Sequence, residues 1–234
     1  MTVSNTNPAW SIGFFYSLKD QKDMVRGYLW GTADFLKPFD FQVIFYNKIE
    51  KGFNKSEKLI VEFDALGKMR QETTSMKAIQ RRAEEFENWG LKLQIQAEVV
   101  GKTVETLETI ETHTKAEELY SYEYETNIVL QPVTTYFNNS FGEKKLKNQD
   151  ASIRTSFQEG SEEKMEEVAN FGLSDEARLQ FYDDRNEKMA ERINALLTGG
   201  NERFFIAISA CHLVGKKGVV ALLSEMFWKV TKVH

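Results

Sequence analysis

The C-terminal part of the chain carries the pattern that most constrains its fold. Residues 203–209 (RFFIAIS) form an apolar run of strand length, residues 216–226 have a helical pattern, and residues 228–233 (WKVTKV) have the pattern of a second strand. A strand, a helix and a strand in succession make a βαβ unit, in which the two strands run parallel within one sheet. The sequence therefore predicts an α/β fold whose sheet is at least partly parallel.

The rest of the chain adds further strands and helices to this unit. A hairpin is predicted because two apolar runs, at residues 11–18 and 25–30, flank a polar break that is typical of a turn. Hydrophobic periodicity predicts the remaining elements: a helix from Asp40, as its N-cap, to Phe53; strands at 59–63 and 103–107; helices within 65–100; mixed helix and loop over 114–150; and a long helix at 174–197 that ends at Gly199. No repeat or linker divides the chain, so we expect a single domain.

Composition narrows the class of protein. The 234 residues are 41% hydrophobic and 28% charged, which is ordinary globular usage. A formal charge of −5 argues against binding to nucleic acid or to an anionic membrane. The chain has no apolar run of membrane-spanning length and no secretory signal pattern at its start. We therefore expect no integral membrane segment and, for the sequence as written, a cytoplasmic protein, although a mature exported domain would look the same.

The chain has few cysteine and histidine side chains that could bind a metal ion. A single cysteine excludes a disulfide framework and a cysteine-based zinc site. Because the chain has only three histidines, any metal site must include carboxylates.

Candidate site residues follow three of the predicted strands. In open α/β sheets, ligands bind beyond the carboxyl ends of the strands. Asp34 follows the second strand of the hairpin, Glu62 is a carboxylate in the otherwise apolar run 59–63, and His212 follows the run 203–209. A carboxylate in an apolar strand needs a partner or a metal ion, so these residues are candidates for one site.

Four blocks in the same order resemble the TraB/PrgY/GumN family, which is related to the Tiki metalloproteases. They are YLWGTADF at 28–35, KLIVEFD at 58–64, GKTVETLET at 101–109, and the block 183–233 that contains DDRNEKMAERINALLTGG and FFIAISACHL. The resemblance implies a mixed, partly parallel sheet wrapped by helices, formed by residues 10–234 after a flexible stretch at 1–9. It also implies a site built from two Gly-x-x-His motifs and a glutamate, with divalent-metal-dependent peptidase activity.

The family's site residues carry over position by position. His212 matches the histidine of the second motif, Glu62 matches the glutamate, and Arg185 with Asn186 matches an Arg-Asn pair on a helix. Asp34 stands where the first motif has histidine, and Ser209 stands where the second motif has glycine.

The resemblance therefore implies a site with one altered metal ligand. Its metal ligands would be His212, Asp34 and Glu62, with Glu62 also available as general base and Arg185 as the group that stabilises an oxyanion. A set of two carboxylates and one imidazole suits a divalent ion such as Mn²⁺ or Co²⁺ better than Zn²⁺. The predicted function is a divalent-metal-dependent hydrolase, specifically a peptidase acting on a peptide or protein. The alternative is a catalytically inactive family member that acts as a peptide-binding or regulatory domain.

The residues themselves leave structural interpretations open. His212 can cap a helix at a strand end, Asp34 can be a turn or N-cap residue, and Arg185 can neutralise Glu62. Cys211 is a small buried residue or, less simply, a nucleophile. Glu108, in the block 101–109, either supports the site or pairs with Lys102, whereas His113 and His234 have no motif context.

Overall fold

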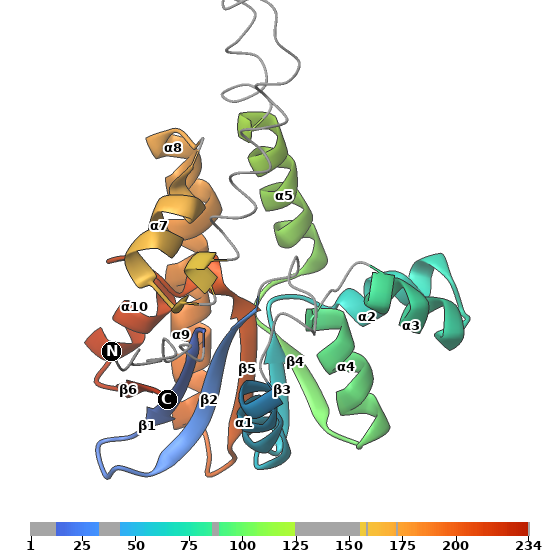
Figure 1. The fold of residues 1–234 in the computed structure, drawn as a ribbon, viewed down its shortest axis with the longest axis horizontal. Helices are drawn as coiled ribbons and strands as arrows, with labels where there is room; N and C mark the ends of the chain where they lie inside the picture. The colour runs from blue at the N-terminus through green and yellow to red at the C-terminus, as the bar shows by residue number, and fades with distance from the viewer. Residues whose placement is uncertain are drawn as a thin grey trace, which may run out of the picture.

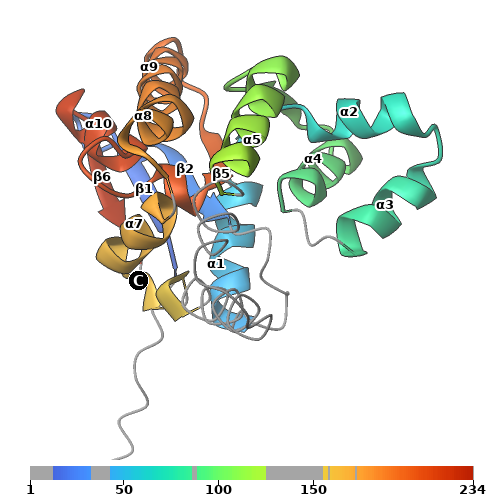
Figure 2. The same ribbon diagram turned by 90° about the horizontal axis from the view of Figure 1, so that it is seen from above.

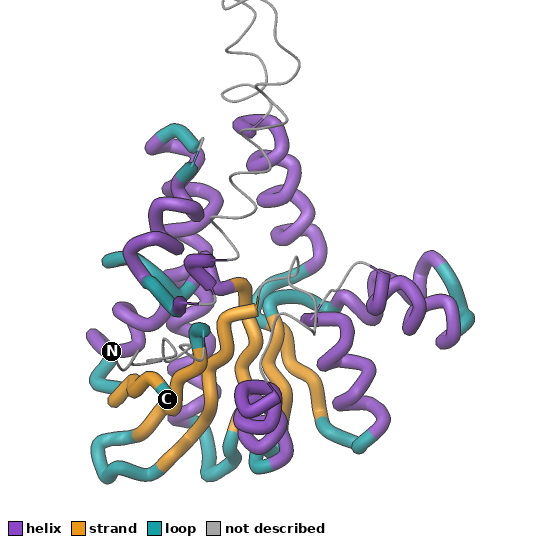
Figure 3. The backbone as a smooth tube through the Cα atoms, viewed as in Figure 1, coloured by secondary structure: helices purple, strands orange, loops and turns teal. Residues whose placement is uncertain are grey.

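The computed structural model describes residues 13–32, 43–85, 89–124, 155–157, 159–171 and 173–233. Six strands of the described residues form one sheet in the order β4-β3-β5-β2-β1-β6 (Figure 1). The strands are β1 (Phe15–Lys19), β2 (Val25–Thr32), β3 (Lys58–Val61), β4 (Thr103–Thr106), β5 (Phe204–Ser209) and β6 (Lys229–Lys232). Figure 3 colours the helices purple and the strands orange. The helices of the described residues are α1 (Val43–Asn54), α2 (Ala65–Glu72), α3 (Met76–Glu85), α4 (Trp89–Val99), α5 (Ile110–Tyr124), α7 (Glu162–Asn170), α8 (Asp175–Arg178), η4 (Leu179–Asp183), α9 (Asp184–Thr198), η5 (Ala210–His212) and α10 (Val219–Glu225).

The sheet is mixed, as predicted, and the chain forms an α/β fold. Strands β2, β5, β3 and β4 run parallel, while β1 is antiparallel to both β2 and β6. The predicted hairpin is confirmed as β1–β2. The C-terminal strand–helix–strand unit is confirmed in direction but its strands are not neighbours, because β2 and β1 lie between β5 and β6.

Side chains of the central strand alternate between two apolar layers. Phe204, Ile206 and Ile208 of β5 face the layer that includes α9 and α10, whereas Phe205 and Ala207 face the layer that includes α1 and α4. Figure 2 shows α1 on one side of the sheet and α9 and α10 on the other. A strand whose side chains are apolar on both sides is typical of a sheet that is buried on both faces.

The predicted helices are confirmed with changes at their ends and in the middle. Residues 65–100 form α2, α3 and α4 where they are described, and these helices share a small separate core that includes Leu66, Ile79 and Leu91. The long helix ends at Thr198, and the Gly199 N–H bonds to the carbonyls of Ala195 and Leu196. A π-helical turn, η4, interrupts it after α8. The proposed N-cap Asp40, residues 1–12 and residues 125–154 lie outside the described residues.

Within the described part of the chain, no helix combines the length and the apolar character needed to cross a membrane.

Gly31 in β2 provides a stability prediction. A Cβ at this position would lie 2.8 Å from Phe14 Cβ, 2.8 Å from Leu213 Cδ1 and 3.0 Å from Ala210 Cα. Because two of these atoms are fixed to the backbone, Gly31→Ala should lower the free energy of unfolding by about 1–3 kcal/mol in urea titrations. The matched control is Gly200→Ala, whose Cβ would have no neighbour closer than 4.0 Å. Equal unfolding midpoints for the two variants would contradict the prediction.

Candidate metal centre

Polar side chains gather where the parallel strands end. Glu62 follows β3 directly, Glu108 lies two residues after β4, and His212 lies in η5, the short turn after β5. Since β3, β4 and β5 run parallel, their carboxyl ends meet at one edge of the sheet. Helix α5 rises from this edge in Figure 1. These polar side chains therefore lie at the edge of the sheet where α/β proteins bind their ligands.

Glu62 is a nearly buried carboxylate, with 13% of its side chain exposed. Its Oε1 accepts a hydrogen bond from the backbone N–H of Ser209 at 2.5 Å. Burial raises the pKa of this carboxyl group, and the charge of Arg185 and the Ser209 N–H oppose that rise without cancelling it. Glu62 is thus held by β5 at Oε1, while its Oε2 lies 3.9 Å from His113 Nδ1.

His212 is buried and has a fixed orientation. Its Nδ1 lies 2.6 Å from Asn186 Oδ1, and the Asn186 amide is itself oriented because Nδ2 donates to the Lys217 carbonyl at 2.9 Å. The Lys217 carbonyl can only accept a hydrogen bond, so the NH₂ group of Asn186 faces that carbonyl and Asn186 Oδ1 faces the imidazole. His212 Nδ1 therefore carries the proton and donates it to Asn186 Oδ1. Nε2 therefore has a free lone pair, and it lies 3.9 Å from Glu62 Oε1. Burial lowers the pKa of His212 well below its ordinary value, so the ring is neutral.

Glu108 and Arg185 form a buried, bidentate ion pair. Arg185 Nη2 lies 2.6 Å from Glu108 Oε1, and Nε lies 3.0 Å from Oε2. A third donor, Nη1, bonds to the Phe181 carbonyl in η4 at 3.1 Å. Burial works against ionisation of Glu108, but hydrogen bonds from His113 and Arg185 outweigh it and lower the pKa. The guanidinium therefore compensates a second buried carboxylate at this edge of the sheet.

His113, in the first turn of α5, completes the cluster. Its Nδ1 lies 2.8 Å from Glu108 Oε1 and 3.9 Å from Glu62 Oε2, and its Nε2 lies 3.3 Å from Glu117 Oε1. The ring stacks on Phe63 with centroids 3.7 Å apart. Burial alone would lower the pKa of His113, but Glu108 and Glu117 raise it to about 9.

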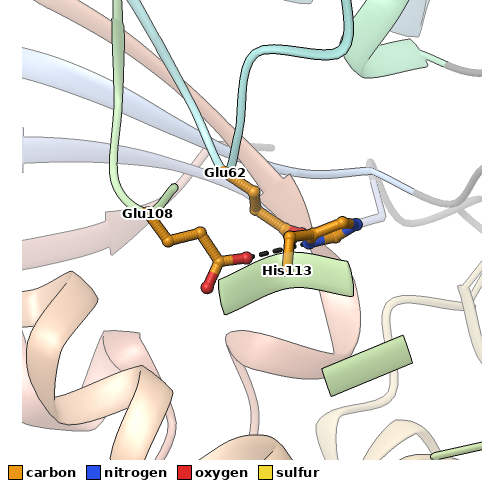
Figure 4. Close-up of side chains that lie close together, drawn as sticks. All are labelled: Glu62, Glu108 and His113. Carbon is orange, nitrogen blue, oxygen red and sulfur yellow. Dashed lines mark hydrogen bonds and ion pairs between the residues drawn. The ribbon is translucent and has the colours of Figure 1, made fainter. Parts of the chain in front are cut away.

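Three of these side chains lie as the ligands of one ion would. Glu62, Glu108 and His113 each offer a ligand atom, and within the described residues these atoms all lie within 4.8 Å of one another. Figure 4 shows both carboxylates pointing toward the His113 ring. Carboxylate and imidazole donors together suit divalent ions such as Mn²⁺, Co²⁺ or Zn²⁺.

The structure brings together most of the residues that the sequence singled out. Glu62, His212 and Arg185 share one site, whereas Asp34 lies outside the described residues and its role as a ligand stays a prediction. Glu62 lies one residue after β3 and not within the strand. The nearest carboxylate partner of Arg185 is Glu108 and not Glu62.

The sequence left two interpretations of Glu108 open, of which one is wrong, and it gave no role to His113. The suggested pairing of Glu108 with Lys102 is wrong, since Glu108 pairs with Arg185 and Lys102 Nζ bonds to the Ser56 carbonyl. His113 carried no motif, although it lies five residues after Glu108, in the first turn after a strand end. That position was the only signal that could have found it.

Cys211 fits the structural interpretation. Burial raises the pKa of its thiol, and its Sγ lies 3.9 Å from Met165 Sδ. A buried thiol with a raised pKa is a poor nucleophile.

The fold and the cluster define an α/β protein with a carboxylate and histidine centre at the carboxyl edge of its parallel strands. Compared with known families, residues 80–232 match the TraB/PrgY/gumN family, and since this is more than half of the chain, the chain belongs to that family. Glu108, His113, Arg185 and His212 fall within the matched range, and Glu62 precedes it. Neither the curated proteins nor the solved structures include a match to the chain.

Proposed function

We propose that this protein is a divalent-metal-dependent hydrolase that cleaves peptide bonds. The observation that carries the proposal is the pair Glu62 and His212, in which a buried carboxylate faces the unprotonated nitrogen of a neutral imidazole across 3.9 Å. This distance is too long for a hydrogen bond. Two ligands that each lie about 2.1 Å from one ion are about 3–4 Å apart, so the gap has the size that a shared ion requires.

Each side chain has a role that follows from its contacts. When bound, the ion would polarise a peptide carbonyl and activate water. Glu62, whose pKa is raised by burial, is a stronger base than an exposed carboxylate and is suited to accept a proton. Arg185 uses its hydrogen bonds to hold Glu108 and the Phe181 carbonyl, so we assign it chiefly a positioning role. Asn186 fixes the tautomer of His212, as partners of ligand histidines do.

Metal titration tests this proposal. Chelator-stripped protein should take up one equivalent of Mn²⁺, Co²⁺ or Zn²⁺, measured by calorimetry and elemental analysis. His212→Ala should bind the ion at least about 100-fold more weakly, because losing a ligand costs no less than losing its supporting hydrogen bond. Gln21→Ala, in the β1–β2 turn at the opposite edge of the sheet, is the control and should bind normally. Wild-type protein that binds no ion more tightly than His212→Ala would refute the proposal.

One observation favours the non-catalytic alternative. Glu108, Arg185 and His113 satisfy one another without an ion, because Arg185 donates to both Glu108 oxygens and His113 bonds to one of them. A family member that had lost its metal could keep this network as a purely structural element and bind peptide above it. Such a protein would bind a peptide equally well with and without chelator, whereas the hydrolase should lose peptide cleavage when the ion is removed.

A further inference from the structure

We propose that the protein has a second binding site, at the edge of the sheet opposite the candidate metal centre, for a small organic anion with an apolar body. The site shares no residue with the carboxylate and histidine cluster and does not depend on the proposed function. Three features support it: a cavity, a guanidinium without an anionic partner, and an exposed aromatic side chain whose backbone is strained.

The cavity lies where the parallel strands begin and has a volume of about 550 Å³. It is enclosed by the β1–β2 turn, the C-terminal end of α9 and the turn from α10 to β6, and its lining includes Arg26, Asn194, Leu197, Met226, Phe227 and Trp228. In Figure 1 the β1–β2 turn lies at the end of the sheet away from α5. Cavities of about 300–1,000 Å³ with apolar walls and a few polar groups are typical of small-molecule sites.

Arg26, near the start of β2, is the cation of this cavity. Its Nη1 donates to Asn201 Oδ1 at 3.2 Å and its Nη2 to the Leu197 carbonyl at 3.5 Å, so both acceptors are neutral. Among the residues that the structure describes, no carboxylate forms an ion pair with this guanidinium. A guanidinium can bind a carboxylate through two parallel N–H groups, so Arg26 is suited to an anionic ligand.

The carboxylates of the β1–β2 turn already have partners. Asp20 Oδ1 accepts the backbone N–H groups of Lys22 and Met24 at 2.9 and 3.0 Å. Asp23 Oδ1 lies 2.8 Å from Lys229 Nζ. Lys22 also lines the cavity, and its exposed side chain adds a second positive charge. The charges that remain available to a ligand are therefore positive.

The end of α9, which would disfavour an anion if its carbonyls were free, is capped. The Gly199 N–H bonds to the carbonyls of Ala195 and Leu196. Arg26 Nη2 bonds to the next carbonyl, that of Leu197. The negative partial charge of the helix end is therefore offset before a ligand enters.

Phe227 follows α10 in a conformation that favours glycine. Its φ is +67°, and 76% of its surface is exposed. The Phe227 N–H bonds to the Ser224 carbonyl and the Trp228 N–H to the Leu223 carbonyl, which is the helix C-cap whose left-handed residue is usually glycine. An exposed phenyl ring that costs backbone strain and adds nothing to the core indicates a role in binding.

The remaining walls define the ligand. Trp228 Nε1 bonds to Asn194 Oδ1 at 2.9 Å, so the polar group of the indole is satisfied within the protein. Leu197 and Met226 add aliphatic surface. A carboxylate bound by Arg26, with an aromatic or aliphatic body against these side chains and Phe227, matches both parts of the cavity.

NMR spectra of isotope-labelled protein, recorded with naphthylacetate and with the neutral naphthylacetamide, test the proposal. Naphthylacetate should shift the Trp228 indole and Phe227 amide signals saturably, with a Kd of about 1 mM or lower. Naphthylacetamide should bind at least about 10-fold more weakly, because it cannot form charge-assisted hydrogen bonds with Arg26. Equal affinities for the two compounds, or no saturable shift, would refute the proposal.

Two variants separate the charge from the aromatic ring. Arg26→Met should bind naphthylacetate no more tightly than naphthylacetamide, whereas Arg192→Met, at an exposed arginine of α9 outside the cavity, should keep the preference for the anion. Phe227→Gly should bind naphthylacetate at least about 5-fold more weakly, since it lacks the phenyl contact. Its urea unfolding midpoint should not fall, because glycine relieves the positive φ.

The pairing of weaker binding with undiminished stability is a result that a purely structural Phe227 would not give. A Phe227→Gly protein that binds naphthylacetate like wild type would overturn the assignment. So would a wild-type dimer in sedimentation that Phe227→Gly loses and naphthylacetate does not affect, since the ring would then pack against a second copy of the chain.

Discussion

Glu62→Gln should abolish ion binding and peptide hydrolysis while leaving the protein at least as stable as wild type. Glutamine has nearly the same shape and its Oε1 can still accept the Ser209 N–H, so packing is preserved. The neutral amide is a poor ligand and cannot act as a base, and losing a general base typically costs about 10²–10⁴-fold in rate. Burial disfavours the charged carboxylate, so removing that charge should not lower the free energy of unfolding of the metal-free protein.

Three measurements on the same samples check this result. Calorimetric titration and cleavage of a fluorogenic peptide mixture report on the ion and the reaction, and urea unfolding with chelator present reports on stability. Glu118→Gln is the matched control, since it makes the same chemical change on the exposed side of α5. A variant that unfolds at lower urea and keeps its activity would show that Glu62 is a structural residue.

Arg185→Met should destabilise the protein by about 3–5 kcal/mol, the range found when one partner of a buried ion pair is removed. Arg185 is 6% exposed, so its loss leaves the Glu108 carboxylate buried without its bidentate partner. Methionine preserves much of the apolar stem, which limits the effect to the lost charge and hydrogen bonds. Urea unfolding monitored by circular dichroism measures the change.

The control for Arg185→Met lies two turns along the same helix. Arg192 has 51% of its side chain exposed and donates to the Thr106 carbonyl, so Arg192→Met should cost at most about 1.5 kcal/mol. The double variant Arg185→Met/Glu108→Gln should recover part of the loss, because it removes the uncompensated charge. Equal costs for Arg185→Met and Arg192→Met would exclude a buried pair at Arg185.

Local patterns in the sequence were enough to predict the main elements. The apolar run at β5 predicted a strand, and the turn-like break before Val25 predicted the β1–β2 hairpin. Strand ends also indicated where chemistry would gather, and Glu62 and His212 do meet there. These features follow from backbone periodicity and from the parallel direction of the strands, which the sequence expresses directly.

Which side chains contact one another in the site depends on the register of the strands and on the helices that pack beside the sheet. Pairing of Val61 with Thr106 brings the residues after β3 beside those after β4, which is why Glu62 and Glu108 lie close together. Helix α5 then turns His113 toward both carboxylates, and α9 supplies Arg185 from a distant part of the chain.

The sequence by itself therefore determined the α/β class of this protein and the edge of the sheet where its polar residues collect. Only the tertiary structure decided that Arg185 compensates Glu108, and that His113, a histidine without a motif, lies beside both Glu62 and Glu108. The physical reason is that an element's periodicity depends on neighbouring residues, whereas the partner of a buried charge depends on which distant elements pack against it.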